Sequence, residues 1–112
     1  RDLHLLGVIL AASEKAVQHV YEHRLRPEEK QHQPWIARVT GQLLAACREW
    51  DARLADRAAA AQPDQVLVTS TVVWSFIQLM IPAVVSAAAF PHIRALAEKG
   101  EALPVFQQYP LV

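Results

Sequence analysis

The sequence predicts an all-α protein, a bundle of about five helices around one central apolar helix. Three observations lead to this prediction. The stretch Gln65–Phe90 contains no Asp, Glu, Lys or Arg, so we expect it to be buried on all sides. Between Ile36 and Leu54, apolar residues recur three or four positions apart, which is the spacing of an amphipathic helix. The β-branched run Val66–Val73 could favour a strand, but no second run is available to pair with it.

Length and composition limit the class of protein. The chain has 112 residues, enough for one hydrophobic core, so we expect a single domain over residues 1–112. Its formal net charge is zero, so there is no basic field to attract nucleic acid. The hydrophobic content of 53% is high for a soluble domain, and we expect a partner to cover part of the apolar surface. Cys47 is the sole cysteine, which excludes an internal disulfide and favours a cytoplasmic location.

The start of the chain and the central segment bear on processing and membranes. The sequence begins with Arg1 rather than Met and shows no signal peptide, so we expect a fragment of a longer protein. The central segment is long enough to span a membrane, but Ser, Thr and Gln dilute it and no basic cluster flanks it. We therefore predict a buried helix and no membrane partner. A small membrane protein, which would require detergent for purification, is the alternative.

The central helix and the segments after it contain residues that typically begin or end helices. Asp64 is the expected N-cap of the central helix, and Pro82, which lacks a backbone N–H, is expected to kink or end it. Pro91 is expected to open the next helix and Gly100 to end it as a C-cap. A last short turn is expected to return three apolar residues to the core, namely Leu103, Val105 and Phe106.

The second helix has the clearest apolar stripe. It is expected to begin at Pro34 and to continue to about Arg57. Its stripe consists of Ile36, Val39, Leu43, Cys47, Trp50 and Leu54. Cys47 lies on this stripe with no nearby base, so we predict a core cysteine rather than a nucleophile. The charged residues on the other side, Asp51 among them, are most simply a solvated face.

The first helix has more apolar residues than one face can hold. We expect it from Asp2, as N-cap, to His23 or Leu25. One stripe contains Leu3, Leu6, Leu10, Val17 and Val20. A second set contains Leu5, Val8, Ile9, Ala12 and Ala16. The second set widens the apolar surface beyond what the core of this chain alone would cover. We therefore expect this helix to face its own core and also a partner. Gly7 lowers the stability of this helix. The helix either tolerates that loss, or the glycine allows close helix packing or leaves room for a ligand.

One motif suggests metal chemistry. His19, Glu22 and His23 form H-x-x-E-H, the inverted zinc-protease pattern. A catalytic zinc needs a third protein ligand, and the acids of the next helix belong to an amphipathic pattern already explained. Histidines at a helix C-terminus also complement its dipole without a metal. We predict no metal site, and the residue chemistry alone indicates a binding or packing module.

Five short motifs form a set that is more specific than any of its members. They are Arg26, Pro27, Glu28 and Glu29; Trp35 and Arg38; Trp74, Phe76, Ile77 and Gln78; Phe90 and Pro91; and Glu101, Ala102, Leu103, Pro104 and Phe106. In this order, and over nearly the whole chain, they resemble the all-helical C-terminal domain of bacterial glutathione S-transferases. One feature departs from that family. Its core helix usually starts with a Ser or Thr cap and an Asp three residues later, whereas here Asp64 is followed by Leu67.

The resemblance implies a division of labour between two domains. A thioredoxin-like N-terminal domain, absent from this sequence, would bind glutathione and supply the Tyr, Ser or Cys that activates its thiol. The present chain would then contain no catalytic residue, bind no cofactor and be inactive alone, with glutathione as the co-substrate of the full-length enzyme. The helical domain would contribute a hydrophobic wall for an electrophilic second substrate and the contact surface of a homodimer.

The resemblance also implies which residues form that wall. Carried onto this chain they are His4, Gly7, Val8 and Ala11, with Tyr109 as a lid. A solvated helix face is the competing interpretation for His4, and a frayed tail is the competing interpretation for Tyr109. Ser13 or Glu14 would reach the glutathione of the partner subunit. An apolar pocket would concentrate a hydrophobic electrophile beside a thiolate made in the neighbouring domain.

Two functions from different classes remain. The first is the substrate-binding and dimerisation domain of a glutathione transferase. The second is a non-catalytic, transferase-like module for protein assembly. A hydrophobic pocket near His4 and Val8 would favour the first, and a flat or filled surface there would favour the second.

Overall fold

The computed structural model describes residues 2–24, 26–57 and 63–108, and within these ranges the protein is helical with no strand. The α-helices are α1 (Asp2–Arg24), α2 (Gln33–Ala55), α3 (Gln65–Met80), α4 (Pro91–Glu101) and α5 (Pro104–Gln108). Two short 3₁₀ helices, η1 (Glu28–Lys30) and η2 (Ala87–Ala89), lie in the connections. The predicted all-α class is confirmed. In this part of the chain no helix combines the length and the apolar character that a membrane crossing requires.

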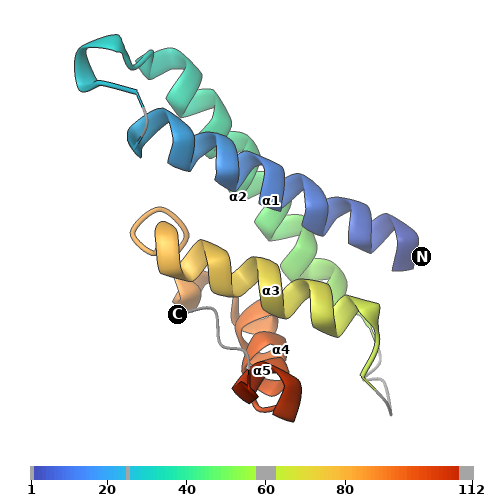
Figure 1. The fold of residues 1–112 in the computed structure, drawn as a ribbon. Helices are drawn as coiled ribbons and strands as arrows, with labels where there is room; N and C mark the ends of the chain where they lie inside the picture. Colours follow the sequence, from blue (N-terminus) through green and yellow to red (C-terminus); the bar gives the residue numbers. More distant parts are fainter. Residues whose placement is uncertain (1, 25, 58–62, 109–112) are drawn as a thin grey trace.

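Four helices surround the core. α1 and α2 form a long antiparallel pair, α3 lies below α1, and α4 lies below α3 (Figure 1). α1 packs against both α2 and α3, and α4 contacts both α3 and α2, so the buried side chains of all four meet in one cluster. The short α5 packs against α4 at the end of the described chain.

The apolar stripe of α2 is buried as its spacing predicts. Ile36, Val39, Leu43, Cys47 and Trp50 are buried, and Leu54 is half-buried. The Trp50 ring meets the edge of Trp74 with the ring centroids 5.9 Å apart, and Trp74 meets Phe90 in the same way at 6.1 Å. The Trp50 indole N–H donates to Ser70 Oγ at 3.2 Å, which satisfies its polar group inside the core. This chain of aromatic rings ties α2 to α3 and to the start of α4.

α3 begins as predicted but is shorter than the charge-free stretch. Asp64 is the N-cap, and its Oδ1 accepts the Leu67 backbone N–H at 3.0 Å. The helix ends at Met80, because Pro82 cannot donate the next helical hydrogen bond. Gln78 Nε2 donates to the Val85 carbonyl at 2.8 Å and holds the turn that follows. The predicted end of the helix near Pro82 is therefore confirmed, and the rest of the charge-free stretch lies outside α3.

α3 is not buried on all sides, which corrects the expectation drawn from its charge-free sequence. Trp74 and Ile77 are buried against the neighbouring helices, but Val68, Val72 and Leu79 are exposed, with Val72 at 48%. α1 and α4 make most of the helix–helix contacts of α3, and the side that carries Val68 and Val72 stays exposed. A charge-free sequence thus leaves an apolar stripe on the surface.

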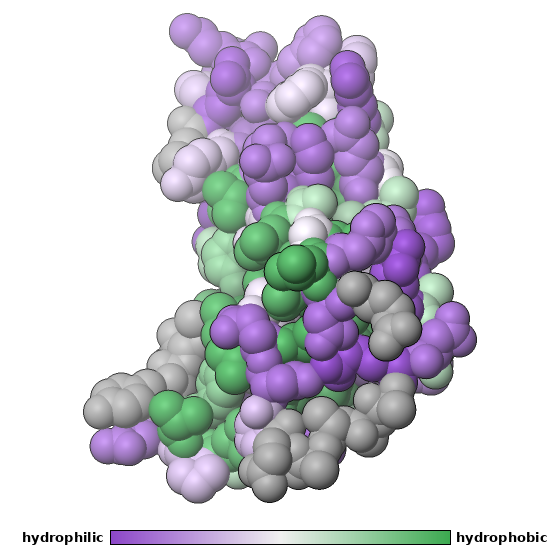
Figure 2. All heavy atoms as spheres, turned by 90° about the vertical axis from the view of Figure 1, so that its right-hand side faces the viewer, coloured by the Kyte–Doolittle hydropathy of each residue, from purple (hydrophilic) through white to green (hydrophobic). Residues whose placement is uncertain are grey.

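The two apolar sets of α1 have the opposite roles from those expected. Leu5, Ile9, Ala12 and Ala16, the set expected to widen the stripe, face the core. Leu3 and Leu10 from the other set are 84% and 59% exposed, while Val20, at the far end, is buried. Figure 2 views the end of the molecule where α1 begins and shows hydrophobic side chains gathered in its middle, between hydrophilic regions. The helix has apolar surface beyond the core, because 3.6-residue geometry cannot turn both sets inward.

Two further expectations on α1 and α5 need correction. Asp2 is the first residue of α1 rather than the residue before it, and its carboxylate accepts from Arg57 at 3.1 and 3.2 Å. In the last turn, Leu103 and Phe106 are half-buried, but Val105 is 57% exposed. α5 is a short helix that packs mainly against α4, so one side of it stays exposed.

The junction of α2, α3 and α4 was not visible in the local sequence. Asp51 of α2 accepts the backbone N–H groups of His92 and Ile93, both at 2.9 Å, and so caps α4 from a distant part of the chain. It is not part of a purely solvated face. Gly100 is not a C-cap: α4 continues to Glu101, and Gly100 is buried where the helix crosses Thr71.

Candidate functional site

The wall residues implied by the family resemblance share one face of α1. His4, Gly7, Val8 and Ala11 follow helical spacing; Val8 is half-buried and the others are exposed. His4 Nε2 lies 3.3 Å from Glu49 Oε2, so this face borders α2. Among the described residues, no atom lies within 4 Å of a Cβ placed at Gly7, so close packing between the described helices is not the reason for the glycine. The strip is largely open surface, and Gly7 and Ala11 keep it low because their side chains are small.

The other residues implied by the resemblance are only partly described. Ser13 is half-buried and Glu14 is exposed, both on α1. Tyr109, the expected lid, lies outside the described residues. Neither of the two hollows that follow is lined by any of these positions.

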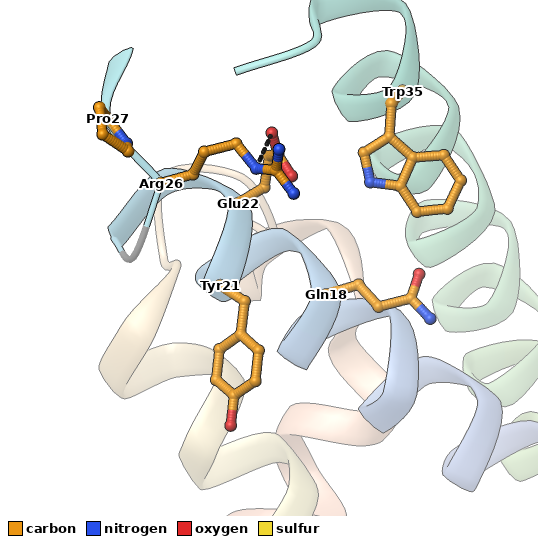
Figure 3. Close-up of a pocket in the computed structure, with 6 residues that line it drawn as sticks. All are labelled: Gln18, Tyr21, Glu22, Arg26, Pro27 and Trp35. Atoms are coloured by element: carbon orange, nitrogen blue, oxygen red, sulfur yellow. Dashed lines mark ion pairs between the residues drawn. The ribbon is translucent and has the colours of Figure 1, made fainter. Parts of the chain in front are cut away.

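A first hollow of about 390 Å³ lies where α1 ends and α2 begins (Figure 3). Its lining consists of Gln18, Tyr21, Glu22, Arg26, Pro27 and Trp35. Gln18 extends from α1 toward α2 on the side of Trp35, whereas Tyr21 points away from Trp35. Gln18 and Glu22 are one helical turn apart, so both lie on the same face of α1, near the end where α1 meets α2.

An ion pair organises one side of this hollow. Arg26 Nε lies 3.2 Å from Glu22 Oε2, and the Glu22 side chain is only 8% exposed. The same carboxylate oxygen accepts the backbone N–H of His32 at 3.3 Å. Gln31 Nε2 donates to the Arg26 carbonyl at 3.1 Å and so fixes the chain at the turn. The buried carboxylate is therefore paired with a cation and with a backbone donor, as a buried charge requires.

The two histidines of the H-x-x-E-H motif pack on each other. Their rings stack with centroids 4.3 Å apart, and His23 Nδ1 lies 3.0 Å from the His19 carbonyl. His19 is buried, and its Nδ1 has no hydrogen-bond partner among the described residues. Burial first, and the neighbouring His23 second, lower the pKa of His19. Glu22 is engaged with Arg26 instead, and the described ranges contain no group of three or more His, Cys, Asp or Glu that could hold a metal.

A second, wider hollow of about 740 Å³ is an open groove between α3 and α4. Trp74, Leu79 and Ala97 contribute apolar surface, while Arg94 and Glu98 are among its charged lining residues. Ser75 Oγ donates a hydrogen bond to Glu101, which joins the two helices along the groove.

A cluster of charges joins three helix ends. Arg57, which follows α2, pairs with Asp2 at the start of α1 and with Asp64 at the start of α3. The hydrogen bond from Arg57 is the main cause that lowers the pKa of Asp2. Burial acts to raise the pKa of Asp64, but the Leu67 amide and Arg57 outweigh it and lower the pKa overall. Each carboxylate also lies at the positive end of a helix dipole.

Cys47 is part of the core, as predicted. It is fully buried, and burial raises the pKa of its thiol to about 12. A thiol with that pKa stays protonated at neutral pH and is a poor nucleophile.

No protein-family model matches the chain, and no curated protein matches it. The resemblance to glutathione transferases therefore depends on the short sequence motifs alone.

The hollow at the α1–α2 junction was missed by reasoning from the sequence. Gln18 and Tyr21 lie between apolar positions of α1, and Trp35 was assigned only as a family motif. The available signal was the aromatic residue directly after Pro34, together with Glu22 in the last turn of α1 and Arg26 just after that helix.

Proposed function

We propose that this chain is the substrate-binding and dimerisation domain of a glutathione transferase that conjugates glutathione to a hydrophobic electrophile. One observation carries the proposal: several residues of the motifs that resemble the family make structural contacts at turns and helix ends. Arg26 pairs with Glu22 at the end of α1, Gln78 holds the turn after α3, and Pro91 opens α4.

Two further anchors also make contacts that join the helices. Trp74 lies between Trp50 and Phe90 in the core, and Glu101 accepts a hydrogen bond from Ser75 across the α3–α4 contact. The departure at the start of α3 does not remove its cap, because Asp64 accepts from Leu67 and pairs with Arg57. A tertiary ion pair thus stands where the family has a local reciprocal cap.

The proposed mechanism assigns binding to this chain and chemistry to a neighbouring domain. The face with Gly7, Val8 and Ala11 is small, open and largely apolar, so a domain placed against it would enclose a pocket for the electrophile. That thioredoxin-like domain would bind glutathione and activate its thiol. Holding the two reactants together lowers the entropic part of the barrier. The thiol of Cys47 takes no part, because it is buried and protonated.

A second candidate is a non-catalytic module for protein assembly. The apolar residues that the chain leaves open favour it: Leu3 and Leu10 on α1 and Val68 and Val72 on α3. These side chains are suited to a protein contact, and the wall residues are an exposed strip rather than an enclosed pocket in this chain.

The test uses the full-length protein. The proposal expects retention on immobilised glutathione and conjugation of a chlorinated dinitrobenzene. The Gly7→Leu variant would fill the wall and raise the KM for the electrophile with little change in the KM for glutathione. Ala45→Leu, on the exposed side of α2, is the matched control and should leave both KM values unchanged. Absence of glutathione binding in a folded, oligomeric protein would favour the assembly module instead.

A further inference from the structure

The amide of Gln18 is unusual among the polar groups of this chain. Its Oε1 is shielded from solvent and accepts no hydrogen bond from the described residues. A buried acceptor without a donor is destabilising, and native proteins rarely retain one without a reason. Figure 3 shows the Gln18 side chain reaching toward α2, with its amide oxygen on the side of Trp35 and its amide nitrogen next to it. The side chain is thus able to present a donor and an acceptor together.

The surroundings of Gln18 select for a flat, uncharged molecule. Trp35 lies across the hollow on α2 and is 39% exposed, which leaves part of its indole surface open. Exposed aromatic rings of this kind stack on planar rings. Arg26 Nε lies 3.2 Å from Glu22 Oε2, so these two opposite charges neutralise each other and do not favour a charged ligand. The hollow has about 390 Å³, within the range of small-molecule sites.

We propose that this hollow binds a small, uncharged heteroaromatic ring that carries adjacent hydrogen-bond donor and acceptor groups, as a lactam does. The Gln18 amide pairs with that edge through two hydrogen bonds, the geometry that glutamine uses to recognise adenine. Trp35 stacks on the ring. The site is distinct from the wall implied for the electrophile, because Gln18 lies about 10 Å along α1 from Ala11 at about 1.5 Å per residue.

Two probes that differ by one methyl group test this proposal on the 112-residue chain. Carbostyril carries a lactam edge, and N-methylcarbostyril lacks its N–H donor. We expect saturable chemical-shift changes at the Trp35 indole N–H and the Gln18 side-chain amide with carbostyril. The N-methyl compound should bind about tenfold more weakly, as expected for loss of one hydrogen bond in a partly shielded site.

Two variants assign the effect to the proposed residues. Gln18→Met keeps the length of the side chain but removes the amide, so it should bind both probes equally. Trp35→Leu should weaken both probes by a similar factor, whereas Gln42→Met, on α2 and outside the hollow, should change neither. Equal binding of the two probes to the unmodified chain, or shifts that map to the α3–α4 groove instead, would overturn the proposal. The probe comparison on the unmodified chain does not depend on any variant being folded.

Discussion

Gly100→Ala tests whether α3 and α4 are packed as closely as the structure shows. A Cβ at this position would lie 1.9 Å from Thr71 Oγ1, 2.9 Å from Thr71 Cβ and 3.0 Å from Thr71 Cγ2. Thr71 is fully buried, and its hydroxyl donates to the Leu67 carbonyl at 2.7 Å, so it has little freedom to move aside. The two helices would have to separate.

Two opposing effects decide the magnitude. Alanine is favoured over glycine inside a helix by about 0.5–1 kcal/mol. Overpacking a closely packed core costs about 1–3 kcal/mol. The contact at Oγ1 is far inside van der Waals distance, so the cost should approach the upper end of that range. We expect Gly100→Ala to lower the free energy of unfolding by about 2 kcal/mol.

Urea unfolding followed by tryptophan fluorescence would measure this change. Gly41→Ala is the matched control, because α2 leaves open space around that glycine. It should raise the free energy of unfolding by about 0.5–1 kcal/mol. Thr71→Ala removes the two atoms at 1.9 and 3.0 Å and should recover part of the loss when combined with Gly100→Ala. If Gly100→Ala were as stabilising as Gly41→Ala, the close α3–α4 contact would be refuted.

Three further predictions concern side chains that act across the fold. Asp51→Ala should lower the free energy of unfolding by about 1 kcal/mol because α4 loses its cap. Asp51→Asn keeps an oxygen that can accept the same hydrogen bonds, so it should retain most of this stability in the same urea assay. His19 has a pKa below its ordinary value of 6.5 in the folded protein, so its contribution is present above that pH and is lost as pH falls through the folded pKa. His19→Phe should flatten the decline of the urea midpoint in this acidic range, and an unchanged slope would argue against the assignment. Arg57→Met should lower the urea midpoint at low salt more than at high salt, because it separates Asp2 and Asp64 from their shared cation. The exposed Arg38→Met is its control, and equal effects at both salt concentrations would contradict the electrostatic explanation.

The candidate site was accessible from the sequence only in part. Helical spacing placed His4, Gly7, Val8 and Ala11 on one face of α1, and the structure shows that they share it. The family resemblance, rather than spacing, made that face a candidate wall. The hollow beside Trp35 forms where the end of α1 meets the start of α2. The turn between the two helices, rather than either helix itself, sets the relative position of these two ends.

Local rules of the sequence determined the helices, the buried stripe of α2 and the Asp64 cap, because each depends on residues within one or two turns of one another. Tertiary structure alone decided which apolar set of α1 faces inward, that Asp51 caps a helix some forty residues away along the chain, and that Gly100 permits a close crossing with Thr71. The physical reason is that periodicity defines the faces of a helix but not its rotation about its own axis. That rotation is set by the side chains of the neighbouring helices.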